Sequence, residues 1–75
     1  MKNLKIIDVP RNFIFCVIGG LEDLREVKEF FKNLPHLYVI TCGIITIGSE
    51  SRMEILCPSA TYEAAINLLE DFISE

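Results

Sequence analysis

The sequence has no surplus of positive charge, and this absence excludes a large class of functions. Its 75 residues include 11 Asp and Glu against 7 Lys and Arg, so the formal net charge is −4. Proteins that bind nucleic acid gain much of their affinity by neutralising phosphates with Lys and Arg. The densest group of cations, Arg25, Lys28 and Lys32, alternates with glutamates along one expected helix, as on a solvated helix face. We therefore expect no nucleic-acid partner.

Long hydrophobic runs and an even set of cysteines are also missing. The longest uncharged stretch, residues 33–49, is too short to cross a bilayer as a helix. Two lysines among the first five residues interrupt the apolar run that a signal peptide needs. The three cysteines, Cys16, Cys42 and Cys57, form no CxxC pair, whereas small secreted domains carry even, dense sets. We expect a cytoplasmic protein with reduced thiols and no membrane partner.

Constellations for catalysis or metal binding are absent as well. The single histidine, His36, has no evident Ser, Cys or Asp partner for nucleophilic catalysis. The carboxylates fall on the expected outer faces of helices, where no cleft would perturb them. Cys42 and Cys57 are expected to be neighbours, but a zinc site needs two more ligands, and cysteine is often buried as a small hydrophobic residue. We expect no enzyme activity, no cofactor and no metal, with these thiols as core packing; a thiol or metal-handling role is the alternative.

What the sequence does contain is enough apolar surface for one small domain. Hydrophobic residues make up 51% of the chain, and such a fraction offsets chain entropy in a way that disordered segments cannot. A chain of this length buries only about 60% of the surface that its unfolded form exposes. It leaves no room for a doubly wound sheet or a separate cofactor domain, so we expect a single domain over residues 1–75.

Apolar periodicity predicts six elements in the order β-β-α-β-β-α. Helical spacing predicts a helix over residues 21–34, which Pro35 ends, and a second helix that follows Ser59 as its N-cap. Runs of β-prone residues predict four strands. These strands cover residues 4–7, 13–18, 36–48 and 52–57, with a turn at Ser49 and Glu50.

This order predicts an α+β domain of the ferredoxin-like type, an antiparallel four-stranded sheet with two helices on one face. The strand that follows the second helix in that fold is missing here. We expect residues 4–8 to fold back through a turn at Pro10 onto residues 13–18 and to occupy the same edge. The predicted order across the sheet is the first, second, fourth and third strands.

The hairpin between the last two strands decides which residues share a face. A turn centred between Ser49 and Glu50 pairs residues whose numbers sum to 99, so that Cys57 faces Cys42. The helix-covered face then carries Tyr38, Ile40, Cys42, Ile44, Met53, Ile55 and Cys57. The uncovered face carries Leu37, Val39, Ile45, Ile47 and Leu56. Because exposed apolar patches usually mark an interface, we expect a homodimer or higher oligomer, formed through this face and these five residues or through the edge of the sheet.

The loop after the second predicted strand has two interpretations. Gly19 and Gly20 stand before a helix, so their backbone N–H groups could approach an anionic ligand. The phosphate-loop glycines and lysine are absent, and acidic residues follow at once. A plain strand-to-helix turn is the simpler interpretation.

Two segments of the chain resemble known families. The segment VPRNFIFCVIGG, followed by a helix, and the segment SRMEILCPSATYEAAINLLEDF resemble the YbeD-like family of small bacterial proteins, which has a ferredoxin-like, ACT-like fold. The same residues resemble ACT domains, regulatory modules that bind amino acids at subunit interfaces. The resemblance implies a homo-oligomeric regulatory or adaptor domain that acts on a partner protein. The alternative that it implies is a small-molecule sensor, with its ligand near Gly19, Gly20, Leu21 and Glu22.

Overall fold

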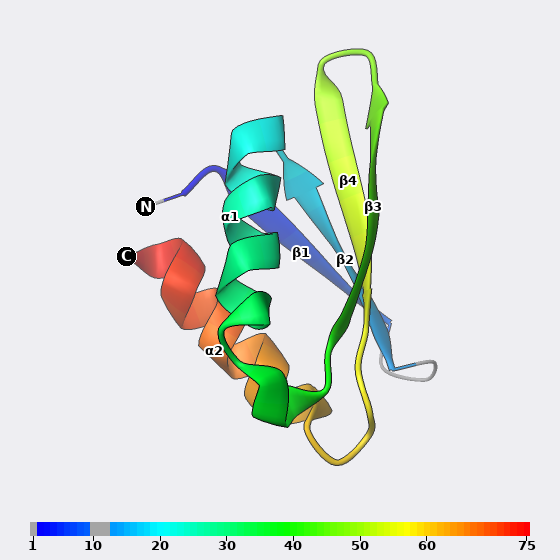
Figure 1. Cartoon of the computed structure of the whole chain (residues 1–75). Helices are drawn as coiled ribbons and strands as arrows, with labels where there is room; N and C mark the ends of the chain where they lie inside the picture. The colour runs from blue at the N-terminus through cyan, green and yellow to red at the C-terminus, as the bar shows by residue number, and fades with distance from the viewer. Residues whose placement is uncertain (1, 10–12) are drawn as a thin grey trace.

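The chain folds into two layers, a sheet and a pair of helices, and the computed structural model describes residues 2–9 and 13–75 of it. The strands are β1 (Leu4–Val9), β2 (Ile14–Gly19), β3 (Ile40–Ile47) and β4 (Glu50–Leu56). The helices are α1 (Leu21–Lys32), the short 3-10 turn η2 (Pro35–Leu37) and α2 (Tyr62–Ser74). Both α-helices lie on the same side of the sheet (Figure 1). The α+β class and its two-layer arrangement are therefore as predicted.

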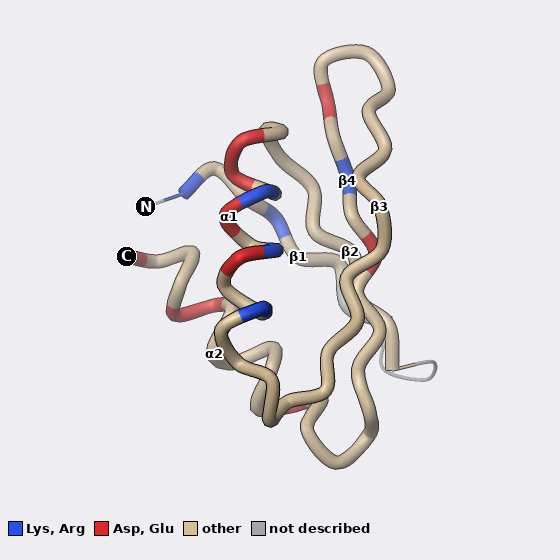
Figure 2. Tube along the Cα trace, viewed as in Figure 1, with Lys and Arg blue, Asp and Glu red and all other residues tan. Residues whose placement is uncertain are grey.

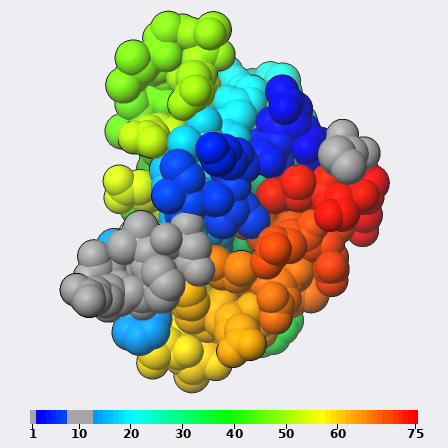
Figure 3. All heavy atoms as spheres, turned by 180° about the vertical axis from the view of Figure 1, so that it is seen from behind, coloured from blue at the N-terminus to red at the C-terminus, as the bar shows by residue number. Residues whose placement is uncertain are grey.

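The strands pair antiparallel in the order β1-β2-β4-β3, which is the order predicted from the sequence. The first strand occupies the edge beside β2, and the predicted turn at Pro10 lies outside the described residues. The N-terminal segment is also attached to the second helix, where the Lys2 backbone N–H donates to the Ile73 carbonyl at 2.9 Å and the Lys2 ammonium lies 4.2 Å from the Phe72 ring centre. Figure 3 shows this blue segment beside the red end of α2.

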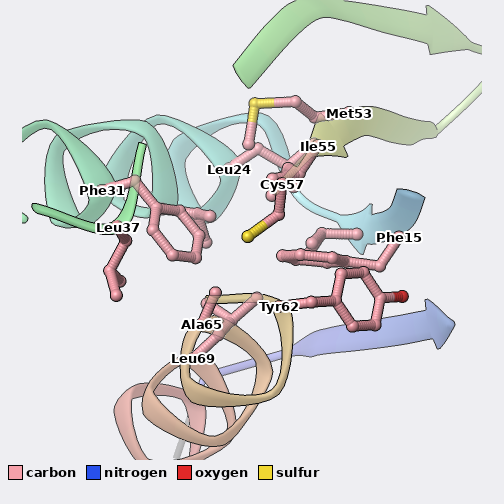
Figure 4. Close-up of a cluster of buried hydrophobic side chains, with 12 residues drawn as sticks. Phe15, Leu24, Phe31, Leu37, Met53, Ile55, Cys57, Tyr62, Ala65 and Leu69 are labelled. Carbon is pink, nitrogen blue, oxygen red and sulfur yellow. The ribbon is translucent and has the colours of Figure 1, made fainter. Parts of the chain in front are cut away.

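The core lies between the sheet and the two helices. Helical spacing buries Leu24, Val27 and Phe31 of α1, and acidic residues occupy its first turn, where the helix dipole favours negative charge. The Phe15 ring of β2 lies 6.2 Å from Phe31 and 5.9 Å from Tyr62, centre to centre, and so joins both helices to the sheet (Figure 4). Burying each such side chain contributes about 1.5–3 kcal/mol to the free energy of unfolding.

The second helix begins later than predicted, with Thr61 and not Ser59 as its N-cap. A turn closed by the Thr61 N–H and the Pro58 carbonyl comes first. The Thr61 hydroxyl makes no cap within the helix; it donates to the Leu37 carbonyl at 2.6 Å and lies 3.3 Å from the Cys57 sulfur. This side chain therefore attaches the start of α2 to η2.

The hairpin between β3 and β4 turns one residue earlier than predicted, at Gly48 and Ser49. Ile47 pairs with Glu50, and the residue numbers of pairs near the turn sum to 97, so the predicted sum of 99 is wrong. The reason is the backbone of Gly48, whose φ of +65° is the left-handed conformation that two-residue hairpin loops require.

A β-bulge then interrupts β3. Thr41 pairs with Ile55 and Ile44 pairs with Met53, so two residues, Cys42 and Gly43, lie opposite one residue of β4. An extra residue on one strand shifts the register by one and exchanges the faces beyond it. The faces predicted for the beginning of β3 are consequently inverted.

Four predicted positions, at the first residue of β3 and just before this strand, are corrected. Leu37 and Val39, predicted on the uncovered face, belong to the covered side: Leu37 is 3% exposed and Val39 packs against the core. Tyr38 and Ile40, predicted on the covered face, are 74% and 64% exposed. Residues 36–39 are also not part of a strand, because Pro35 begins η2 and Tyr38 ends it with a left-handed φ of +54°.

Candidate functional site

The open face of the sheet, which is the face turned away from α1 and α2, carries an apolar surface that the charged residues of β4 interrupt. Strand alternation places Phe15, Val17, Met53 and Ile55 in the core, and the residues between them on the open face. We call the following residues the open-face patch: Ile7, Ile14, Cys16, Ile18, Ile40, Ile45, Ile47 and Leu56. An antiparallel sheet with one face in water ordinarily carries polar residues there. This face carries mainly isoleucine.

The hairpin end of β3 is the most exposed part of the patch. Ile45 is 59% exposed and Ile47 is 74% exposed, so both side chains remain in water in the isolated chain. Both were predicted on this face, as was Leu56, which is also exposed, although less so. Of the five residues predicted to form an interface, these three lie together on the open face, and Leu37 and Val39 do not.

Two aromatic residues extend the patch at its opposite end. Phe13 and Tyr38 both adopt positive φ angles, +53° and +54°, without being glycine. Together with Ile40 and Leu56 they line a hollow of about 330 Å³. Each left-handed residue of this kind costs of order 1–3 kcal/mol, and such strain is concentrated at functional positions. Phe13 was predicted in the second strand and Tyr38 on the covered face of the third, whereas neither residue lies within a strand of the structure.

Charged residues occupy the middle of the open face on β4. Arg52 and Glu54 are separated by one residue, so both side chains point to this face. Arg52 pairs across the sheet with Ile18 and with Ile45, while Glu54 pairs with Cys16. Among the described residues, neither Arg52 nor Glu54 has a charged partner within ion-pair distance.

The bulge creates a hollow beside these charges. Cys42, Gly43, Ile44, Ile45, Arg52 and Glu54 line a volume of about 310 Å³. A Cβ atom at Gly43 would meet nothing within 4 Å, which shows how open the bulge is. The predicted opposition of Cys42 and Cys57 is therefore wrong: Cys42 lines this hollow, whereas Cys57 lies in the core beside Thr61.

The cysteines and the remaining acidic residues form no metal centre in the part of the chain that the structure describes. All three cysteines are free, and no group of three or more His, Cys, Asp and Glu side chains could hold a metal ion in residues 2–9 and 13–75. Only Cys57 has the core position that was predicted for two of them. No helix in these residues is long and apolar enough to cross a membrane.

Gly19, the last residue of β2, and Gly20, which follows it, line a separate hollow of about 380 Å³. Gly19 and Gly20 lie there with Lys5 and Glu50, whereas Leu21 and Glu22, the other two predicted ligand residues, do not line it. Packing explains why residue 19 is a glycine, since a Cβ atom there would lie 2.6 Å from the backbone oxygen of Asn3. Gly20 has an ordinary extended backbone and precedes α1 without a side-chain cap.

Comparisons of the chain with protein-family models, with curated proteins and with solved structures find no match. The information about function therefore lies in the exposed surfaces of the molecule. Among these surfaces, the open-face patch departs most clearly from what a sheet in contact with water needs.

Proposed function

We propose that the protein is a small homo-oligomeric regulatory or adaptor domain of the ferredoxin-like type, and that its open sheet face binds a second copy of the chain. The observation that carries this proposal is the open-face patch, with Ile45 and Ile47 more than half exposed. The ferredoxin-like assignment is supported by β1, which lies at the edge beside β2 where that fold has its last strand. The free cysteines support a reducing, cytoplasmic location.

Apolar burial is the main driving force that this interface would use. Fully burying an isoleucine side chain contributes about 1.5–3 kcal/mol. Association must first overcome roughly 4–15 kcal/mol of lost translational and rotational freedom. Several isoleucines buried together supply that order of free energy, whereas one or two do not, so the number of patch residues that are buried together matters more than any single member.

The charges on β4 favour one orientation of the two copies. If the strands of the copies run antiparallel across the interface, about a two-fold axis at Met53, Arg52 of one copy faces the partner's Glu54, and the pair occurs twice. The same rotation places Ile45 over the bulge hollow at Cys42 and Gly43 of the other copy. If the two-fold axis ran parallel to the strands instead, Arg52 would face the partner's Arg52, and Glu54 would face the partner's Glu54. Repulsion between these like charges disfavours that arrangement.

Sedimentation velocity at micromolar concentration tests the proposal. We expect the wild-type protein to sediment as a dimer or higher oligomer, and the variant I45E/I47E to sediment as a monomer, because its carboxylates cannot be buried unpaired. The matched control is Leu68→Glu, which changes an exposed leucine on α2 and should leave the oligomer intact. Circular dichroism confirms that each variant is folded. A monomeric wild type, or equal dissociation by Leu68→Glu, would contradict the proposal.

A small-molecule sensor of the ACT-like kind is the second candidate. The observation in its favour is the hollow at Gly19 and Gly20, where Lys5 supplies a positive charge beside the N-terminus of α1. A thermal-shift series with the twenty amino acids tests it. A ligand bound at this hollow should raise the melting temperature of the wild type but not that of Lys5→Ala. No shift with any amino acid would remove this candidate.

A further inference from the structure

A basic groove runs between α1 and β3, on the helix side of the sheet and away from the open-face patch. It has a volume of about 520 Å³. Its lining residues are Arg25, Lys28, Glu29, Phe31, Lys32, Val39 and Thr41. Figure 2 shows the basic segments of α1 along the side of the helix that faces β3. The proposed dimer does not use this groove, so the inference below goes beyond the proposed function and does not depend on it.

The charge of the groove is opposite to that of the whole chain. Arg25, Lys28 and Lys32 are three of the seven Lys and Arg residues, and Glu29 is the only acidic residue in the lining. Arg25 also pairs with Glu22 at 2.8 Å, but both side chains are largely exposed. An exposed pair of this kind contributes only about 0–1 kcal/mol, so Arg25 can exchange it for another carboxylate.

The other wall of the groove is a strand edge. Because β3 is the last strand in the order β1-β2-β4-β3, its outer side offers unpaired N–H and C=O groups to a further strand. Its eight residues, ITCGIITI, contain no charged residue and no proline, the two features that most often protect an edge. The bulge at Cys42 and Gly43 interrupts the edge but does not close it.

We propose that this groove binds an extended acidic peptide segment of another protein, which adds to β3 as a fifth strand. Main-chain hydrogen bonds to β3 then supply affinity, and the side chains that point to α1 supply specificity, as in other cases of strand addition. The strand edge alternates donors and acceptors, which matches a peptide backbone; a phosphate backbone offers acceptors only. This is why the partner is a peptide and not a nucleic acid.

The spacing of the cations defines the peptide further. Arg25 and Lys32 are seven residues apart on α1, about 10 Å along the helix axis. Side chains on one face of a strand recur every second residue, about 6.6 Å apart. Two acidic residues at positions i and i+2 of the peptide therefore fit between the three cations. The floor formed by Phe31 and Val39 favours an aliphatic residue at a neighbouring position on the same face.

Selection from a displayed library of random heptapeptides tests this inference. We expect the wild-type protein to enrich peptides with acidic residues at i and i+2 at least tenfold over the unselected library. Lys28→Glu should abolish that enrichment. The matched control Lys5→Glu makes the same charge change at an exposed position of β1 and should retain it. Circular dichroism shows that both variants keep the fold.

Amide chemical shifts then locate the bound peptide. A selected peptide should shift amide signals of residues 39–47 and of α1, and the same peptide with alternate backbone nitrogens methylated should fail to bind. The inference is overturned if no acidic pattern is enriched, if both lysine variants lose it equally, or if the shifts fall on the open face. It is also overturned if I45E/I47E still dimerises through β3, because the occupant of the edge is then a second copy.

Discussion

The two faces of the sheet carry similar side chains and have different surroundings. On the covered face, Phe15 and Ile55 are completely buried by the protein's own helices. On the open face, Ile45 and Ile47 have the same aliphatic character and remain in water. The open face also carries Arg52 and Glu54, but its isoleucines differ from the core residues chiefly in that no helix covers them. Apolar side chains on both faces of the sheet are the reason for our proposal that a second copy of the chain covers the open face.

The largest expected effect comes from removing a side chain on the covered face. Phe15→Ala should lower the free energy of unfolding by about 3–5 kcal/mol, because it leaves a cavity between Phe31 and Tyr62. Ile47→Ala removes a side chain of the open face and should change that free energy by less than about 0.5 kcal/mol in the dilute, monomeric range. Urea titration measures both. Equal losses would mean that the two faces do not differ in the isolated chain.

The covered face could be predicted from the sequence because its signal is periodic. Helical spacing identified the buried stripe of α1, and the two apolar periods gave the order of elements along the chain, from which ferredoxin-like packing predicted the order of the strands in the sheet. The same reasoning placed Ile45, Ile47 and Leu56 on the open face although the register was wrong. The sum of paired residue numbers is 97 and not the predicted 99, so β3 and β4 are displaced by two residues relative to the predicted pairing. Because side chains alternate between the faces with a period of two, a displacement by two residues leaves every residue on its predicted face.

The beginning of β3 could not be predicted because its geometry depends on single backbone angles. The bulge at Cys42 and Gly43 adds an odd shift, which moves Leu37 and Val39 to the core side. Tyr38 reaches the solvent through a left-handed backbone that its side chain type does not indicate. Apolar spacing reports burial, and it does not report where a strand takes in an extra residue.

The next largest expected effect comes from a substitution at Gly19, where β2 pairs with β1. It tests how closely these two strands pack. Gly19→Ala should lower the free energy of unfolding by about 1–3 kcal/mol, since its Cβ would lie 2.6 Å from both the Asn3 oxygen and a Leu4 methyl. Gly20→Ala is the control: its Cβ would lie no closer than 3.8 Å to another side chain, at Asp23, and its φ of −74° suits alanine. It should be neutral or stabilising by up to about 1 kcal/mol.

These two glycine variants separate packing from ligand binding at the loop after β2. Thermal or urea unfolding without any added ligand gives the comparison directly. If Gly20→Ala destabilises the protein as much as Gly19→Ala, the close approach of Asn3 and Leu4 does not explain why glycine occupies positions 19 and 20. The loop would then need another account, and the sensor candidate would gain weight.

The smallest expected effect concerns the charges of the open face and tests how the two copies are oriented. Arg52→Glu places acidic residues at both positions 52 and 54 of each copy, so the antiparallel dimer would bring like charges together. We expect its dissociation constant to rise about tenfold, which corresponds to about 1.4 kcal/mol. Glu54→Arg should have a similar effect by the same reasoning, because it places positive charges at both positions 52 and 54. Sedimentation equilibrium over a dilution series measures both constants.

The charge swap R52E/E54R completes the test, because it restores opposite charges across an antiparallel interface. We expect it to recover most of the affinity that either single change removes, and added salt to reduce the difference between all four proteins. If the swap is as weak as the two single changes combined, Arg52 does not face the partner's Glu54. The open face could then still bind a second copy through its isoleucines, but in another orientation, and I45E/I47E would distinguish that case from the absence of any dimer.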